Sequence, residues 1–287
     1  MNHLGRPASR RVIALDVGGT HSRVALIEDG RIIERAQRST PARHGPPAVV
    51  AALDELLAPW RAEPSLPIGV AIAGVVAGPG VTAHAGLPGW NAYPLAARLG
   101  ELHQRPVHVI NDARAAAWGE YCHGAGRGCS EFCFVTVSTG VGAGLVLDGR
   151  LHRARNGLEA ELGETLTTDG RPMEDLASGT ALDRAAREMG LANASALCDA
   201  ADNGHPAAAA ALQQAVSILA AKLADLTVLL GITRSAIGGG LGLRPGYLDR
   251  LQQAMQTLPP LCRHELVPAA LGADAGLLGV AAWLARA

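Results

Sequence analysis

Two stretches of the chain, residues 12–32 and 134–151, repeat one pattern of apolar and polar positions. In each stretch an apolar run ends in a loop rich in glycine and threonine, a second apolar run follows, and an Asp-Gly pair leads into a third. An Asp-Gly pair between apolar runs favours a hairpin turn. When the two pairs are aligned without gaps, Thr20 falls on Thr139. The pattern predicts the same three-stranded unit twice.

The first loop places a carboxylate and two glycines at the end of an apolar run. Val12–Leu15 is expected to form a buried strand, and an unpaired carboxylate at Asp16 would be costly there. Gly18 and Gly19 allow close approach of the backbone, and the Thr20 hydroxyl adds a donor. A phosphate with its Mg²⁺ fits this loop, with Asp16 reaching the metal directly or through water. A tight hairpin with a capping Asp is the alternative interpretation.

The second loop contains Ser138, Thr139, Gly140 and Gly142. Glycines at alternate positions leave one strand face bare, so that a phosphate can lie against it. Two such loops can present backbone N–H groups to a polyanion from opposite sides, which suggests a cleft for a nucleoside triphosphate. The chain has no Gly-x-x-x-x-Gly-Lys-Ser/Thr motif, and Lys222 is its only lysine. A P-loop NTPase is therefore excluded.

A third glycine cluster, Gly238-Gly239-Gly240, follows an apolar helix and a short strand. It is a candidate for the floor under an adenine or a ribose. The alternative is an ordinary turn from a strand to a helix.

The main candidate for chemistry is Asp112. It follows the apolar run Val107–Asn111 and precedes Ala113–Tyr121, a segment rich in helix formers. A helix N-terminus favours an ionised carboxylate, so Asp112 is expected to be deprotonated and able to accept a proton from an attacking hydroxyl. An N-cap Asp without catalytic function is the alternative. The Asn111 amide could orient a sugar hydroxyl.

Three glutamates, Glu161, Glu164 and Glu174, are spaced by a turn and a short loop. Each carboxylate oxygen can accept from a hydroxyl, so the three could converge on one polyol. They could equally be solvated surface residues.

Five motifs follow one another along the chain: Asp16–Thr20, Asn111-Asp112, Ser138–Gly142, Glu161–Gly163 and Ile237–Gly240. Their order resembles the ROK family (repressors, open reading frames and sugar kinases) over nearly the whole chain. The resemblance implies an α/β fold, the duplicated actin-like ATPase (ribonuclease-H-like) architecture, with two lobes around a nucleotide and sugar cleft.

The resemblance also implies a role for each motif. Asp112 would be the base for phosphoryl transfer from ATP to a sugar 6-hydroxyl, and Gly74 and Val75 would lie near an N-acetyl group. The other implied sugar contacts are Asn111, Glu161 and Glu174, and Glu164 can still accept from a sugar hydroxyl. The implied nucleotide contacts are Asp16, Gly18, Gly19, Thr20, Ser138, Thr139, Gly140, Gly142, Gly238, Gly239 and Gly240.

Within the family, three runs most resemble the bacterial N-acetylmannosamine kinases. They are Asn111–Tyr121, Val135–Gly142 and Asp274–Gly279. This resemblance implies N-acetylmannosamine as the sugar and a place in sialic acid breakdown.

The chain departs from the family pattern at two motifs. Glu164 stands where the family has a histidine, and residues 165–173 replace a zinc loop but contain neither Cys nor His. We therefore expect no structural zinc, and Glu161 and Glu174 must be held by packing and hydrogen bonds. His21 replaces a frequent lysine, which would weaken a positive charge near the phosphates at neutral pH.

Composition agrees with a soluble enzyme. The chain has 287 residues, 48% of them hydrophobic, and a net charge of −1, which argues against nucleic acid or an anionic membrane surface as a partner. Five cysteines fit a reducing cytoplasm. Cys122, Cys129 and Cys133 show no Cys-x-x-Cys spacing, so a zinc site there is not expected. The family resemblance implies a homodimer that acts on a small sugar.

The expected organisation is a first lobe over residues 1–110, a second over 111–274, and a helix at 275–287 that returns to the first lobe by family analogy. Glycines and prolines make residues 73–90 rich in turns. The basic segment Met1–Arg11 runs directly into a strand and is not expected to be a signal peptide. Val216–Leu230 contains two charged residues and is not expected to span a bilayer.

Three other functions are weighed against this one. A transcriptional repressor is disfavoured because only about ten residues precede the first strand, too few for a helix-turn-helix. A catalytically silent sugar sensor would not need Asp112 and two phosphate loops. A glucokinase or an N-acetylglucosamine kinase would differ only in the stereochemistry and substituents of the sugar that the site binds.

Overall fold

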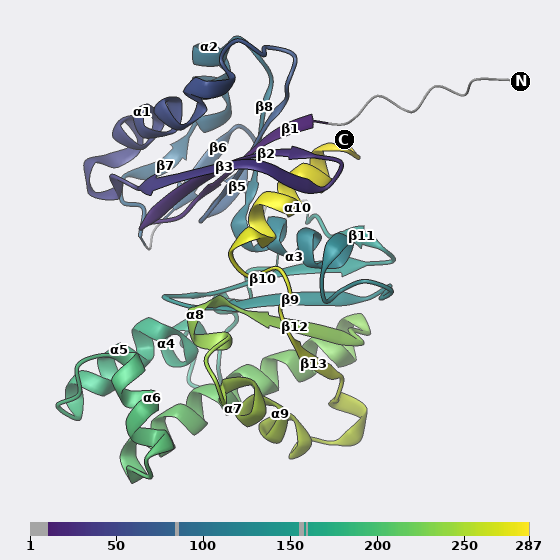
Figure 1. The fold of residues 1–287 in the computed structure, drawn as a ribbon. Coiled ribbons are helices and arrows are strands. Elements are labelled where there is room, and N and C mark those ends of the chain that lie inside the picture. Colours follow the sequence, from purple (N-terminus) through teal and green to yellow (C-terminus); the bar gives the residue numbers. More distant parts are fainter. Residues whose placement is uncertain (1–10, 84–85, 155–157, 159, 287) are drawn as a thin grey trace, which may run out of the picture. The chain divides into compact units, whose positions relative to one another are not determined.

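The computed structural model describes residues 11–83, 86–154, 158 and 160–286. These residues form two compact units, each with its own five-stranded sheet (Figure 1). The N-terminal unit takes in described residues 11–123, 154 and 273–286, and the C-terminal unit takes in the described residues of 124–153 and 158–272.

The sheet of the N-terminal unit has the strand order β3-β2-β1-β4-β8. β1 pairs antiparallel with β2 and parallel with β4, and β4 pairs parallel with β8. The strands are β1 (Arg11–Val17), β2 (His21–Glu28), β3 (Arg31–Ser39), β4 (Ile68–Ile72) and β8 (Val107–Asn111).

Helices cover both faces of this sheet. Ile13 and Leu15 of β1 share one core cluster with Val49 and Leu53 of α1 (Gly45–Leu57) and with apolar residues of α2 (Leu95–His103). α3 (Asp112–His123) and α10 (Ala275–Leu284) pack on the opposite face, where β1 turns Asp16 toward α10. The unit also contains the small sheet β5 (Val75–Ala77), β6 (Gly80–Ala83) and β7 (Trp90–Tyr93), and the short helices η1 (Ala42–His44), η2 (Ala58–Trp60) and η5 (Gly272–Asp274) lie at its connections.

The sheet of the C-terminal unit has the equivalent strand order, β11-β10-β9-β12-β13. The antiparallel hairpin β9-β10-β11 corresponds to β1-β2-β3, and β12 and β13 follow in parallel as β4 and β8 do. The duplication predicted from the repeat is confirmed. The strands are β9 (Phe132–Val137), β10 (Val141–Leu147), β11 (Arg150–Leu151), β12 (Arg234–Gly238) and β13 (Glu265–Pro268).

The two Asp-Gly turns have the same backbone shape. φ is 48° at Asp29 and 76° at Gly30, and it is 50° at Asp148 and 68° at Gly149. Positive φ at both central residues defines the turn that suits the twist of a two-residue hairpin. The same dipeptide therefore closes the same hairpin in both units.

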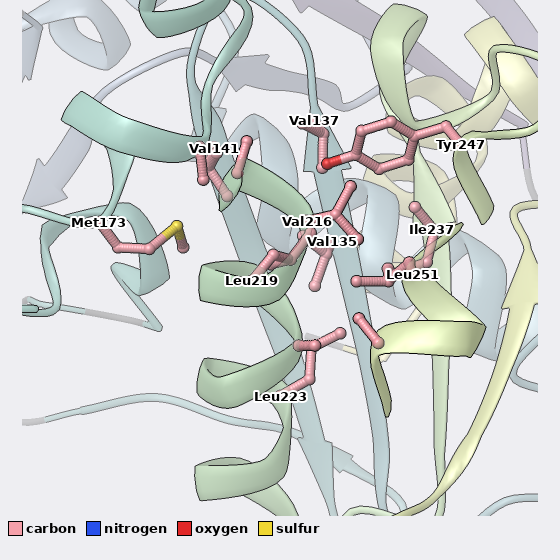
Figure 2. Close-up of a cluster of buried hydrophobic side chains, with 14 of the residues drawn as sticks. Val135, Val137, Val141, Met173, Val216, Leu219, Leu223, Ile237, Tyr247 and Leu251 are labelled. Carbon is pink, nitrogen blue, oxygen red and sulfur yellow. The ribbon is translucent and has the colours of Figure 1, made fainter. Parts of the chain in front are cut away.

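The core of the C-terminal unit lies between β9 and the long helix α7 (Pro206–Leu230). Figure 2 shows Val216, Leu219 and Leu223 of α7 beside Val135 of β9, and Met173 reaches the same cluster. By length and composition, α7 is the single described helix that could cross a membrane. Leu212, Val216, Leu219 and Leu223 are core residues of the unit, although the apolar residues at the end of the helix are exposed, so that criterion alone carries no membrane assignment. The other helices are η3 (Leu162–Glu164), α4 (Glu174–Ala177), α5 (Gly179–Glu188), α6 (Ala194–Asp202), α8 (Gly239–Gly242), α9 (Tyr247–Gln256) and η4 (Pro260–Cys262).

The division between the units falls after α3, whereas the boundary expected from the sequence lies before it. The reason is the close packing of α3 against α10. A Cβ at Gly119 would lie 2.3 Å from the Ala275 carbonyl oxygen, and one at Gly279 would lie 1.7 Å from the Ala115 carbonyl oxygen. Only small residues allow two helices to approach so closely, so Asp112 belongs to the N-terminal unit.

Candidate functional site

Asp16 occupies the next-to-last position of β1 and is directly opposite Arg23 of β2. The Arg23 guanidinium donates to Asp16 Oδ2 at 3.1 Å, and the Asp16 side chain is 17% exposed. Burial, followed by the negative charge of Asp112, raises the pKa of Asp16 from 3.8 to about 6, against the opposing effect of Arg23. A further cation beside Asp16 would therefore stabilise its ionised form.

The Gly18–Thr20 loop connects β1 to β2. The Gly18 N–H donates to the His21 carbonyl at 3.0 Å, and a Cβ at Gly19 would lie 2.7 Å from the Gly86 carbonyl oxygen. Within the described residues, no partner accepts from the N–H groups of Gly19 and Thr20. The loop therefore has backbone donors available to an anion, as the sequence predicted for a phosphate loop.

Asn111 ends β8, and both ends of its amide are hydrogen-bonded. Nδ2 donates to the Gly74 carbonyl at 3.0 Å, and Oδ1 accepts from the Arg114 N–H at 2.9 Å. Gly74 has φ of 129°, and a Cβ there would lie 2.6 Å from the Thr82 carbonyl oxygen, so this position requires glycine. Asn111 thus holds Gly74 beside the start of α3, and the half-buried Val75 follows in β5.

Asp112 is the first residue of α3, as expected, but the helix N-terminus is not the largest effect on the pKa of its carboxyl group. Its Oδ1 accepts from the Ala113 N–H at 2.8 Å, which favours the ionised form. Burial nevertheless dominates and raises the pKa of Asp112 above its usual 3.8. Loss of hydration destabilises the ionised carboxylate more than the helix N-terminus stabilises it. A carboxyl group with a raised pKa is a stronger base once ionised.

The second loop lies between β9 and β10. The Ser138 N–H donates to the Gly140 carbonyl at 2.9 Å, and the side chains of Ser138 and Thr139 are exposed. Among the residues that the structure describes, none accepts from the N–H groups of Thr139 and Gly140. Val141 begins the pairing of β10 with β9, and Gly142 follows it opposite Thr136. This loop has the same kind of free donors as its counterpart.

The third glycine cluster lies at the end of β12, beside the end of β9. Gly239 has φ of 82°, and a Cβ there would lie 2.3 Å from the Val137 carbonyl oxygen. A Cβ at Gly238 would lie 2.8 Å from the Phe134 ring, whereas Gly240 faces open space. The strand-to-helix turn is therefore present, and its glycines allow β12 to approach β9 where the second loop begins.

The three glutamates differ in their surroundings. Glu161 precedes η3 and is half-buried, and Glu164 ends η3 and is exposed. Glu174 Oε2 accepts from the Val141 N–H at 2.7 Å, so this carboxylate already bonds to the second loop.

The residues in the place of a zinc loop form a small hairpin. Thr167 exchanges backbone hydrogen bonds with the segment near Arg171, and Asp169 accepts from the Arg171 guanidinium at 2.6 and 2.8 Å. In the described part of the chain, no group of three or more His, Cys, Asp or Glu residues is arranged to hold a metal ion. Cys133 is buried, and burial raises the pKa of its thiol to about 12.

Sequence reasoning missed Arg23. The strand register places it opposite Asp16, and this could have been derived by folding the first repeat as a hairpin about the Gly18–Thr20 loop. Lys222 was noted only as the single lysine, although its Nζ donates to the Leu166 carbonyl at 2.9 Å and so anchors the hairpin.

Comparison with known proteins settles the family. The family model described as "ROK family" matches residues 12–287. This chain belongs to the ROK family. The ROK chain is 39% identical over 95% of its length to the "Bifunctional enzyme NanE/NanK" of Brucella melitensis, and spans 54% of that relative. It is 36% identical over 94% of its length to the "N-acetylmannosamine kinase" of Yersinia pestis, of which it covers 97%.

Solved structures agree with the fold of this ROK chain. A ROK family glucokinase from Streptomyces griseus, in complex with glucose and AMPPNP, superposes with a TM-score of 0.79 at 28% identity. The match covers 96% of this chain and 99% of the glucokinase. The predicted family and the predicted duplicated actin-like fold are confirmed, whereas the roles assigned to single residues stay predictions.

Proposed function

We propose that this chain is an ATP-dependent kinase that phosphorylates the 6-hydroxyl of N-acetylmannosamine. The observation that carries the proposal is its 36% identity to a protein of that name, over 97% of that protein's length. The chain spans about half the length of the Brucella relatives that it matches, whose names combine two activities. The proposal concerns the kinase activity alone.

Asp112 is the proposed catalytic base. It accepts the proton of the sugar 6-hydroxyl as the oxygen attacks the γ-phosphorus, the bond to ADP breaks, and the proton stays on the carboxyl group. Burial raises the pKa of Asp112, which brings its basicity closer to the working pH. Asn111 fixes the start of α3 through its bond to the Arg114 N–H and so positions this carboxylate.

The ATP phosphates are proposed to bind at the two glycine loops. Gly18, Gly19 and Thr20 serve one loop; Ser138, Thr139, Gly140 and Gly142 serve the other; and Gly238, Gly239 and Gly240 lie under the adenosine. The N–H groups of Thr139 and Gly140, like those of Gly19 and Thr20, have no acceptor in the described residues. Free backbone donors in a turn are suited to phosphate oxygens.

Asp16 is the proposed contact to Mg²⁺, directly or through a water. The fit rests on its largely buried carboxylate, whose pKa of about 6 reflects too little compensating positive charge. Mg²⁺ supplies charge neutralisation on the phosphates and prefers oxygen ligands. No structural zinc is part of the proposal.

The sugar is proposed to contact Asn111, Asp112, Glu161, Glu164 and Glu174, with its N-acetyl group near Gly74 and Val75. Glu164 is exposed and can accept from a hydroxyl, but an ionised carboxylate cannot donate as a histidine could. The proposal extends to a cytoplasmic homodimer in sialic acid breakdown, with a small sugar as its partner and neither nucleic acid nor membrane.

Two alternatives share part of this account. A glucokinase is supported by the Streptomyces griseus structure with glucose, at 28% identity, and an N-acetylglucosamine kinase would use the same mechanism. A catalytically silent sugar-binding regulator is the alternative from another class.

The test is ADP release by purified protein with ATP and Mg²⁺ over N-acetylmannosamine, N-acetylglucosamine, mannose and glucose, with Asp112→Asn as the blank. We expect the highest kcat/KM for N-acetylmannosamine. Preference for glucose would keep the mechanism and reject the substrate. No Asp112-dependent turnover on any sugar would reject the kinase and favour the silent regulator.

A further inference from the structure

Glu174 makes its observed contact with the second glycine loop. Its Oε2 accepts from the Val141 N–H at 2.7 Å, at the point where the loop enters β10. A Cβ at Gly140 would lie 2.3 Å from the same oxygen. The carboxylate therefore fills the space that the missing side chain of Gly140 leaves.

The other side of Glu174 packs on the Glu161–Gly163 motif. A Cβ at Gly163 would lie 3.3 Å from both Cβ and Oε2 of Glu174, and 2.5 Å from the Val141 carbonyl oxygen. One carboxylate thus lies between Gly140 and Gly163, and it bonds to the loop. The two glycines belong to different sequence motifs, and Glu174 connects them.

The segment that follows Glu174 holds the rest of the loop. The Gly179 N–H donates to the Ser138 carbonyl at 2.7 Å, and Thr180 donates to the Thr139 carbonyl through its N–H at 3.1 Å and its hydroxyl at 2.8 Å. The loop carbonyls are therefore taken up by the 174–180 segment. Thr139 and Gly140 keep N–H groups that no described residue accepts from.

The position of Glu174 is itself fixed from the preceding hairpin. The Met173 N–H donates to the Thr165 carbonyl at 2.8 Å, and the Met173 side chain is buried in the core cluster that contains Val141 (Figure 2). Lys222 of α7 donates to the Leu166 carbonyl at 2.9 Å. The hairpin, the core and the loop therefore hold Glu174 from three sides.

We propose that Glu174 is a positioning residue for nucleotide binding, which orders the Ser138–Gly142 loop by accepting from the Val141 N–H. The proposal rests on the proposed function, since that function assigns this loop to the ATP phosphates. If Glu174 orders this loop, its substitution changes the affinity for the nucleotide, whereas a residue that only contacts the sugar would leave that affinity unchanged. Without the acceptor, the Val141 N–H loses its partner and the loop gains freedom that nucleotide binding must remove.

The experiment measures the affinity for ADP with Mg²⁺, in the absence of sugar, by isothermal titration calorimetry. Glu174→Ala removes the acceptor, Glu174→Asp keeps the charge but withdraws the oxygen, and Glu174→Gln keeps an acceptor without the charge. Asp175→Ala is the matched control, because Asp175 is the next residue of α4 and is exposed.

We expect Glu174→Ala and Glu174→Asp to weaken ADP binding about tenfold, the effect of leaving a buried donor unpaired. Glu174→Gln and Asp175→Ala should bind within about threefold of the unchanged protein. The Asp variant keeps the test decisive if the Ala variant does not fold.

Unchanged ADP affinity in the Ala or Asp variant, with an increase only in the KM for sugar, would overturn the proposal and leave Glu174 as a sugar contact. Loss of ADP binding in the Gln variant would also overturn it, because charge rather than hydrogen bonding would then be decisive. If the unchanged protein bound no ADP, the assignment of the loop to ATP would fail, and the proposal with it.

Discussion

Arg23 and Asp16 face each other across the β1–β2 hairpin, and the Arg23 guanidinium donates to the Asp16 carboxylate at 3.1 Å. The pair leaves Asp16 incompletely compensated, since burial and the charge of Asp112 still raise its pKa to about 6. A carboxylate that is costly in the empty protein is suited to a site whose ligand brings a cation.

Asp16→Asn is expected to stabilise the ligand-free protein at neutral pH while reducing kinase activity. A carboxyl whose pKa rises from 3.8 to about 6 on folding favours the folded state below pH 3.8, and that contribution is lost as the pH rises through 6. At pH 8 the buried charge of Asp16 therefore lowers the free energy of unfolding by up to about 3 kcal/mol, and the uncharged Asn side chain would remove this penalty. Urea unfolding at pH 4 and pH 8 measures the difference.

Asp148→Asn is the control for that measurement, because Asp148 is exposed in an Asp-Gly turn whose positive φ also suits Asn. It should show no comparable gain at pH 8. Equal stability of Asp16→Asn and the unchanged protein at pH 8 would show that Asp16 is not a costly charge.

Asp112→Asn is expected to lower kcat by about 10²- to 10⁴-fold, because the proton acceptor is lost, and to leave sugar affinity largely intact. In the unchanged protein the raised pKa of Asp112 predicts that kcat/KM falls on the acid side at a pH above the usual 3.8. Because Asp16 and Asp112 interact, the apparent value belongs to the pair. A pH–rate profile and sugar titration check both points, and a variant with full turnover would exclude Asp112 as the base.

Gly19→Ala and Gly18→Ala form a matched pair in one loop. A Cβ at position 19 would lie 2.7 Å from the Gly86 carbonyl oxygen, whereas one at position 18 would lie 3.4 Å from the His21 carbonyl oxygen. The first contact requires the backbone to move, so we expect Gly19→Ala to raise the KM for ATP about tenfold or more. Gly18→Ala should have the smaller effect. Equal KM values for ATP in the two variants would show that the close contact between Gly19 and Gly86 does not affect nucleotide binding.

His264 is expected to make stability depend on pH in the acid range. Its ring nitrogens lie 2.6 Å from the Thr227 hydroxyl and 2.7 Å from the Ser235 hydroxyl, and burial lowers its pKa from 6.5 to about 4. The unfolded chain therefore takes up the proton first, and stability is lost as the pH falls from 6.5 to 4, by about 3 kcal/mol.

Urea unfolding of His264→Gln between pH 7 and pH 4 tests this, with the exposed His44→Gln as the control. Relative to the unchanged protein, the His264 variant should gain stability as the pH falls from 7 to 4, because it lacks this cost, and the control should show no such gain. The same slope in both variants would show that other groups cause the pH dependence.

Much of the scaffold was accessible from local patterns. The Asp29-Gly30 and Asp148-Gly149 pairs predict two hairpins because few other residues accept positive φ at both turn positions, and both hairpins are present. Likewise, Asp112 lies between a strand and a helix, as the change of pattern there indicates.

The sequence was less informative about groups that depend on burial and on distant partners. The pKa of Asp112 is raised because the folded unit removes it from water, which no local pattern shows. The contacts from Glu174 to Val141 and from Asn111 to Gly74 join residues 33 and 37 positions apart. Such pairs need the packing of β4, β8, α4 and the loops, which spacing along the chain does not specify.

The most direct test of the central claim is the identity of the product formed from N-acetylmannosamine and ATP. Two-dimensional ¹H–³¹P NMR of the reaction mixture should correlate the new phosphorus signal with the two protons on C6, and the signal should be absent with Asp112→Asn. Correlation with the anomeric proton, or an unchanged signal with the Asn variant, would contradict the proposed 6-kinase with Asp112 as its base.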